Sequence, residues 1–147
     1  MRSYSTSILF IFIIWIGATS YTLAEAKSGP DAFRPLTNEP GNAKRGETAV
    51  RDANNVTCLI CHEIPIKGEP NQGKIGPPLR NIGDRLTSEQ IRQKLIYPKF
   101  SNPETIMPSY YQISDLNRVL GKYRGKSIYS EQQIEDVITF LLTLKSK

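Results

Sequence analysis

The sequence predicts an all-α protein with one folded domain, and three features support this prediction. Thr87 and Ser130 each begin a capping box, with a glutamine three residues later. Apolar residues follow each capping box at helical spacing, and a stripe of small residues follows Asn42 at the same spacing. The chain has 147 residues, which is enough for one such domain.

The first 26 residues have the pattern of a secretory signal. Arg2 precedes an apolar run from Ile8 to Ala18, and Ala24-Glu25-Ala26 has the small-x-small pattern of a signal-peptidase site. The apolar run is short for a membrane span, which needs about 20 apolar residues. We therefore expect cleavage after Ala26 and export to the periplasm, and an uncleaved membrane anchor is the alternative.

Two segments follow in the mature chain. Residues 27–41 are expected to form an extended N-terminal arm, because Pro30, Pro35 and Pro40 interrupt it. Residues 42–147 are expected to form the folded domain, which starts with a short helix from Asn42 to Arg51. A glycine inside that helix costs about 1 kcal/mol relative to alanine. Gly46 is explained if the last helix crosses the first one at this point.

The central motif is Cys58-Leu59-Ile60-Cys61-His62, the spacing of a c-type haem attachment site. A near-helical turn places both thiols at one edge of the porphyrin, where each can add across a vinyl group. A Cys-x-x-Cys pair can also be a redox dithiol, half of a zinc site or a disulfide. Zinc needs about four ligands, and this chain has three cysteine and histidine residues in total. With both thiols in thioethers, no disulfide is expected.

The residue inventory limits the ligands of a haem iron. His62 is the one histidine, and Met107 is the one methionine left after cleavage of the signal. We expect His62 as the proximal ligand and Met107 as the second ligand, because a thioether suits haem iron. Pro108 would stiffen the loop that presents the sulfur. The alternatives are a core methionine with lysine or tyrosine ligation, or an open site.

A histidine ligand usually donates its other ring N–H to a carbonyl, which fixes the tautomer. The polar loop after the motif leads to Gly76-Pro77-Pro78-Leu79, and the Pro77 carbonyl is the candidate acceptor. Leu79 would then pack against the porphyrin. The alternative is an ordinary Gly-Pro turn.

Two further helices and a long loop complete the domain. The capping box at Thr87 begins a helix to about Ile96, which Pro98 stops. Residues 97–111 are expected to be an irregular loop without a helix, and its aromatic residues are candidates to wall the haem. The capping box at Ser130 begins an amphipathic helix to about Leu144. The aromatic candidates are Tyr97, Phe100, Tyr110 and Tyr111.

The net charge is +5 and the sequence pI is about 9.3. The basic residues are scattered, so nucleic acid is not an expected partner. An acidic protein partner is the expectation, and a merely solvated surface is the alternative. Lys122, Arg124 and Lys126 form a candidate basic patch, for which a solvated loop is the simpler account.

The motifs in this order resemble a class I cytochrome c, and the resemblance covers nearly all of the chain from Asn42 on. That resemblance implies helices packed around one covalently bound haem c. A narrower resemblance is to the SoxX family, the monohaem subunit of the SoxAX complex. It is carried by residues 73–79, 123–126, 133–137 and above all by Asn-Pro-Glu-Thr-Ile-Met-Pro-Ser-Tyr-Tyr at 102–111.

The SoxX resemblance implies an electron-transfer subunit without catalytic residues of its own. Cys58 and Cys61 would hold the haem, and His62 and Met107 would ligate its iron. The complex would couple thiosulfate oxidatively to a cysteine of the SoxYZ carrier, as an L-cysteine S-thiosulfotransferase. The heterodimer partner would be a SoxA-like cytochrome that holds the reactive site, and electrons would pass to a downstream cytochrome. A free-standing periplasmic electron carrier remains the alternative function.

Overall fold

The computed structural model describes residues 34–114 and 116–146, and the regular secondary structure in these ranges consists of helices joined by loops. The expected signal peptide lies outside the described residues, as does the first part of the expected arm. No described residue belongs to a strand, which confirms the all-α prediction. None of the described helices is long and apolar enough to cross a membrane. The elements are α1 (Ala43–Arg51), η1 (Cys58–Ile60), α2 (Ile82–Arg85), α3 (Ser88–Ile96), α4 (Pro98–Ser101), η2 (Gly121–Tyr123) and α5 (Glu131–Thr143).

The three longer helices begin where the sequence predicts. The Asn42 side chain accepts hydrogen bonds from the amides of Lys44 and Arg45 in the first turn of α1. Thr87 and Ser130 form complete capping boxes, in which each side chain accepts from the amide of the third helical residue and the glutamine there reaches back. These contacts satisfy amide groups that have no partner inside the helix, so local sequence alone defines the three starts.

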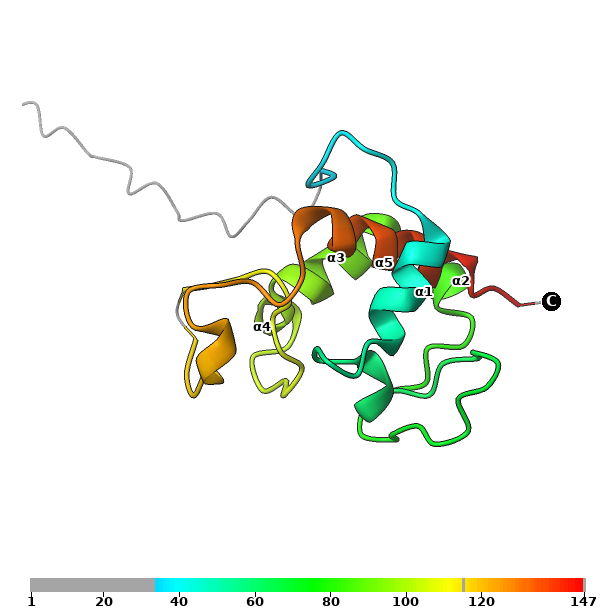
Figure 1. The fold of residues 1–147 in the computed structure, drawn as a ribbon. Coiled ribbons are helices and arrows are strands. Elements are labelled where there is room, and N and C mark those ends of the chain that lie inside the picture. The colour runs from blue at the N-terminus through cyan, green and yellow to red at the C-terminus, as the bar shows by residue number, and fades with distance from the viewer. Residues whose placement is uncertain (1–33, 115, 147) are drawn as a thin grey trace, which may run out of the picture.

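The first and last helices cross closely at Gly46, as predicted (Figure 1). A β-carbon at this position would lie 2.0 Å from the Asp136 carbonyl oxygen and 2.8 Å from the β-carbon of Phe140. Only glycine lets the two backbones approach this far, which accounts for its presence inside a helix despite the entropic cost. The crossing fixes the end of α1, and the haem motif follows that end after a short loop.

We expect Gly46→Ala to destabilise the protein by about 1–3 kcal/mol, because overpacking at the crossing outweighs the better helix propensity of alanine. The midpoint of urea denaturation measures this change. Thr48→Ala is the matched control, because Thr48 is exposed on the same helix. If Gly46→Ala were as stable as Thr48→Ala, the close approach of the helices would be contradicted.

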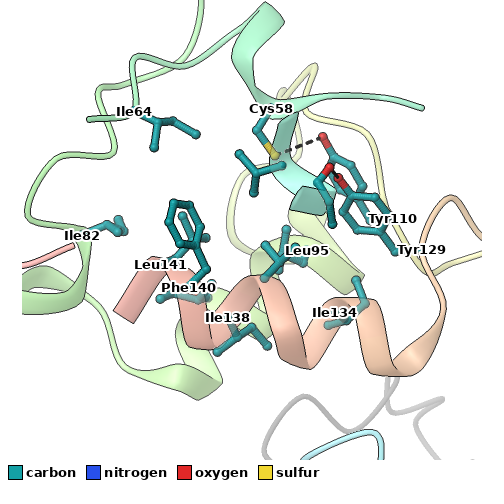
Figure 2. Close-up of a cluster of buried hydrophobic side chains, with 14 of the residues drawn as sticks. Cys58, Ile64, Ile82, Leu95, Tyr110, Tyr129, Ile134, Ile138, Phe140 and Leu141 are labelled. Carbon is teal, nitrogen blue, oxygen red and sulfur yellow. Dashed lines mark hydrogen bonds between the residues drawn. The ribbon is translucent and has the colours of Figure 1, made fainter. Parts of the chain in front are cut away.

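The hydrophobic core lies between α5, α3 and the haem-motif segment. Ile134, Val137, Ile138 and Leu141 of α5 are buried, with Leu95 of α3 packed against them (Figure 2). Phe140 is also buried, because it lies at the crossing of α5 with Gly46. The core therefore extends around more of α5 than the helical stripe alone indicates.

Two carboxylates of α5 are buried and hold the N-terminal arm and the neighbouring helices. Glu135 receives a bidentate pair of bonds from Arg92 of α3 at 2.7 and 2.8 Å, and the Leu36 amide donates to it at 3.0 Å. Asp136 accepts from the Asn42 amide at 2.7 Å and from Arg45 at 2.7 and 2.8 Å. The described part of the arm is thus attached to α5 rather than free.

Burial alone would raise the pKa of Asp136, but the hydrogen bond from Arg45 and the other donors outweigh it and lower that pKa. The Asp136 carboxylate therefore remains charged although it is buried. Because the folded pKa is depressed, its contribution to stability is present at neutral pH and is lost as the pH falls through that value.

The expectation of no helix within residues 97–111 is wrong, because residues Pro98–Ser101 form the one-turn helix α4. Pro98 ends α3, as predicted, but it also begins α4 as its first residue. Proline is favoured at that position, because the amide it lacks would have no partner there and its φ is already helical. The four-residue helix α2 is also absent from the prediction. Both helices are too short to show helical periodicity in the sequence.

Candidate haem site

The haem motif begins with one turn of 3-10 helix, η1, which follows α1 after the loop of residues 52–57. Thr57 ties this turn to α1, because its hydroxyl donates to the Val50 carbonyl at 2.6 Å and accepts from the Leu59 amide at 3.2 Å. The His62 amide donates to the Cys58 carbonyl at 2.9 Å, which closes the turn. This is the near-helical turn that the spacing predicts. The two cysteines form no disulfide with each other, and Cys58 is buried and Cys61 half-buried.

The His62 ring is held in one orientation by its neighbours. Nδ1 lies 2.7 Å from the Pro77 carbonyl oxygen. Because a carbonyl can only accept, Nδ1 carries the proton and Nε2 keeps its lone pair for a metal. Gly76 packs directly against the ring, since a β-carbon there would be 2.3 Å from Cε1 and 2.8 Å from Nε2. The expected contact to Pro77 is therefore present, and Gly76 is a second determinant that the sequence did not reveal.

The segment that carries Gly76 and Pro77 is tied to the motif by three backbone hydrogen bonds. The amides of Gly73 and Gly76 donate to the carbonyls of Leu59 and Cys61, each at 2.8 Å. The Leu79 amide donates to the Glu63 carbonyl at the same distance. Leu79 itself is half-buried and packs against the core. The loop is a fixed support for His62 rather than a free connection.

Met107 lies in the loop that follows α4. Figure 1 shows the loop after α4 and the loop between the haem motif and α2 on opposite sides of the domain. It is half-buried, packs against the core, and its amide donates to Thr105 Oγ1 at 3.2 Å. The loop is fixed after Met107, because Ser109 Oγ donates to the Ile96 carbonyl and the Tyr110 amide donates to the Leu95 carbonyl at 2.8 Å. The thioether is thus presented on a constrained loop that α3 supports.

Tyr110 contributes a contact that the sequence did not identify. It is only 4% exposed, stacks on Tyr129 with ring centroids 4.8 Å apart, and places its hydroxyl 3.9 Å from Cys58 Sγ (Figure 2). Burial raises the pKa of Tyr110, so its hydroxyl stays protonated beside the Cys58 sulfur. Because Tyr110 and Cys58 are 52 residues apart, no local sequence pattern could have predicted this contact.

The remaining aromatic candidates behave differently from Tyr110. Phe100 is 67% exposed and packs against Tyr97, with ring centroids 6.4 Å apart. The Tyr111 hydroxyl donates to Glu131 at 2.7 Å, at the start of α5. Of the four candidates, Tyr110 is the one that the structure brings to the haem motif.

These residues fit a covalently bound haem. Cys58 and Cys61 have the spacing for two thioether bonds and form no disulfide. Nε2 of His62 is available to a metal, and the Met107 thioether lies on a loop held by hydrogen bonds. In the described residues, no group of three or more His, Cys, Asp or Glu side chains could hold a metal ion by itself. Cys58 and Cys61 would hold the haem, with His62 and Met107 as ligands of its iron. Bound haem supplies a one-electron iron couple, whose potential His/Met ligation raises.

The helical fold and this site together define a monohaem c-type cytochrome of class I. A family profile described as "Cytochrome c" matches residues 43–145. A chain of the structure titled "Crystal structure of SoxXA from P. pantotrophus" is similar over 77% of this chain and 88% of that chain. The identity is 34% and the TM-score 0.65. No curated protein is significantly similar in sequence.

This chain belongs to the cytochrome c family, and within it the chain is a SoxX-like monohaem cytochrome. Its cofactor is covalently bound haem c, and its role is electron transfer. The class I cytochrome c fold expected from the resemblance is confirmed.

Proposed function

We propose that this chain is the electron-accepting subunit of a SoxAX-type complex that joins thiosulfate to a cysteine of a SoxYZ-type carrier. The observation that carries the proposal is the 34% identity, over most of both chains, to a chain from a SoxXA structure. The partner is then a SoxA-like cytochrome, bound as a heterodimer. Export to the periplasm, directed by residues 1–26, belongs to the same proposal.

The division of labour follows from the cysteine inventory. Joining a thiosulfate sulfur to a cysteine thiol forms one S–S bond, releases the thiol proton and gives up two electrons. This chain has two cysteines, and both are placed to bind haem. No third thiol remains to carry sulfur, so the bond forms on the partner and the carrier. This chain accepts the electrons one at a time, and a downstream cytochrome receives them.

Isolation from thiosulfate-grown native cells tests the proposal. We expect a tagged chain to co-purify with a larger haem protein at a 1:1 ratio and to remain with it through gel filtration. Thiosulfate and the reduced carrier should then reduce the haem of the isolated complex, and the carrier should gain the mass of one thiosulfate. A chain that elutes alone and stays oxidised would instead indicate a free-standing electron carrier.

A further inference from the structure

Residues 112–128, all of which except Asp115 the structure describes, leave the domain as an excursion, and nothing in the haem site explains it. The Tyr129 amide donates to the Tyr110 carbonyl at 2.9 Å, which joins the two ends of this segment. The excursion contains η2, which packs against none of the described helices. Figure 1 shows it extending from the helices on the side away from the C-terminus. We call residues 112–128 the excursion below.

The excursion is held in place at its far end. Lys122 Nζ donates to the Asn54 carbonyl at 2.7 Å and lies 4.8 Å from the centre of the Tyr123 ring. The Tyr123 hydroxyl donates to Asn55 Oδ1 at 2.9 Å. These anchors attach the excursion to the loop that leads into the haem motif. A surface fixed in advance loses less entropy on binding than a free loop does.

Three aliphatic side chains of this fixed segment face solvent. Ile113 is 57% exposed, Leu116 38% and Leu120 64%. The three other exposed large aliphatics of the described chain adjoin residues of the haem site: Ile60 lies inside the motif, Ile75 beside Gly76 and Ile106 beside Met107. The excursion itself contains no residue of the haem site, so haem binding does not explain its exposed side chains. These three exposed side chains fall within eight consecutive residues of one fixed segment. Exposed apolar surface on a folded domain commonly marks an interaction site.

The charge of the excursion is strongly positive. Four basic side chains are exposed, and the segment has a single carboxylate, Asp115, in its sequence. The same segment therefore carries exposed apolar and exposed basic side chains, which are the two kinds that make up the apolar centre and the polar rim of a protein interface. The four basic residues are Arg118, Lys122, Arg124 and Lys126.

We propose that the excursion is the docking surface for the larger haem subunit of the complex. The matching surface on that partner is an apolar groove bordered by carboxylates, which would take Ile113 and Leu120 and pair with Arg124 and Lys126. This inference rests on the proposed function, because that function supplies the protein partner. An anionic membrane surface has similar chemistry, but membrane association typically uses an amphipathic helix, and these side chains lie on an irregular loop.

The apolar part of the surface is tested with the double variant Ile113→Ser/Leu120→Ser. The haem-containing variant is titrated with the larger haem subunit isolated from the native complex. We expect binding at least about tenfold weaker than for the wild type, with an unchanged haem spectrum and thermal midpoint. Ile75→Ser is the comparison, because it removes an exposed aliphatic side chain beside the haem motif instead.

The basic part is tested with Arg124→Glu/Lys126→Glu, which leaves the anchoring Lys122 intact. We expect slower association at low salt and a difference from the wild type that shrinks as salt is added. Lys44→Glu/Lys145→Glu is the matched control, because it reverses two exposed charges on α1 and after α5. The control should associate at close to the wild-type rate.

The outcomes separate this inference from the function it rests on. If the wild type binds the larger subunit and the excursion variants bind it more weakly, docking at the excursion is supported. If the wild type binds and only Ile75→Ser weakens binding, docking at the excursion is wrong and the partner binds the haem-motif face instead. The proposed function is unaffected by that result. Failure of the wild type to bind the larger subunit overturns both. If the excursion variants bind the subunit normally but lose binding to vesicles of anionic lipid, the surface is a membrane contact and the proposal is wrong.

Discussion

The double variant Cys58→Ser/Cys61→Ser is expected to lose all covalent haem. Each thioether needs one thiol, and serine keeps the size of the side chain while removing its sulfur. Haem staining of a denaturing gel and extraction into acidified acetone measure the result. The wild-type haem stays with the polypeptide in both assays, whereas the haem of the double variant is extracted. Each single variant should keep one attachment and shift the pyridine haemochrome band.

Tyr110→Phe is the control for this experiment. It removes the hydroxyl that lies 3.9 Å from Cys58 Sγ and leaves both thiols and the aromatic stack on Tyr129 in place. We expect its haem to remain covalently attached. Haem that resists extraction from the double serine variant would show that the motif is not the attachment site.

The main helices and the site motif were predictable because their signals are local. A capping box occupies four consecutive residues, and the helices at Thr87 and Ser130 begin as their boxes indicate. The crossing at Gly46 was predictable for a different reason, since a glycine inside a helix needs an explanation and close approach of another helix supplies one. The contact of His62 with Pro77 follows from the usual second hydrogen bond of a histidine ligand.

The features that the sequence did not reveal depend on contacts between distant residues. Glu135 and Asp136 look like acidic residues placed early in a helix to suit its dipole. In the structure they are buried, and their partners Arg92 and Arg45 lie 43 and 91 residues away. The contact of Tyr110 with Cys58 is of the same kind. No spacing rule connects such pairs, because only the completed fold brings them together.

The second large effect is expected from Met107→Ala, which removes the proposed sulfur ligand of the iron. His/Met ligation raises the reduction potential of a haem, and axial ligands together tune haem potentials over about 0.8 V. We therefore expect the potential to fall by on the order of 0.1 V or more. The weak red absorption band of the sulfur–iron bond should disappear. Redox titration followed by absorption spectroscopy measures both changes on the same sample.

Ile106→Ala distinguishes loss of the ligand from disturbance of its loop. Ile106 precedes Met107 and is exposed, so its removal changes the same loop without touching the sulfur. We expect a potential and a red band close to those of the wild type. The loop is braced beyond Met107 by Ser109 and Tyr110, so a single truncation should not displace it. If Met107→Ala kept the red band and the potential, the sulfur would not be a ligand, and Met107 would only be part of the core.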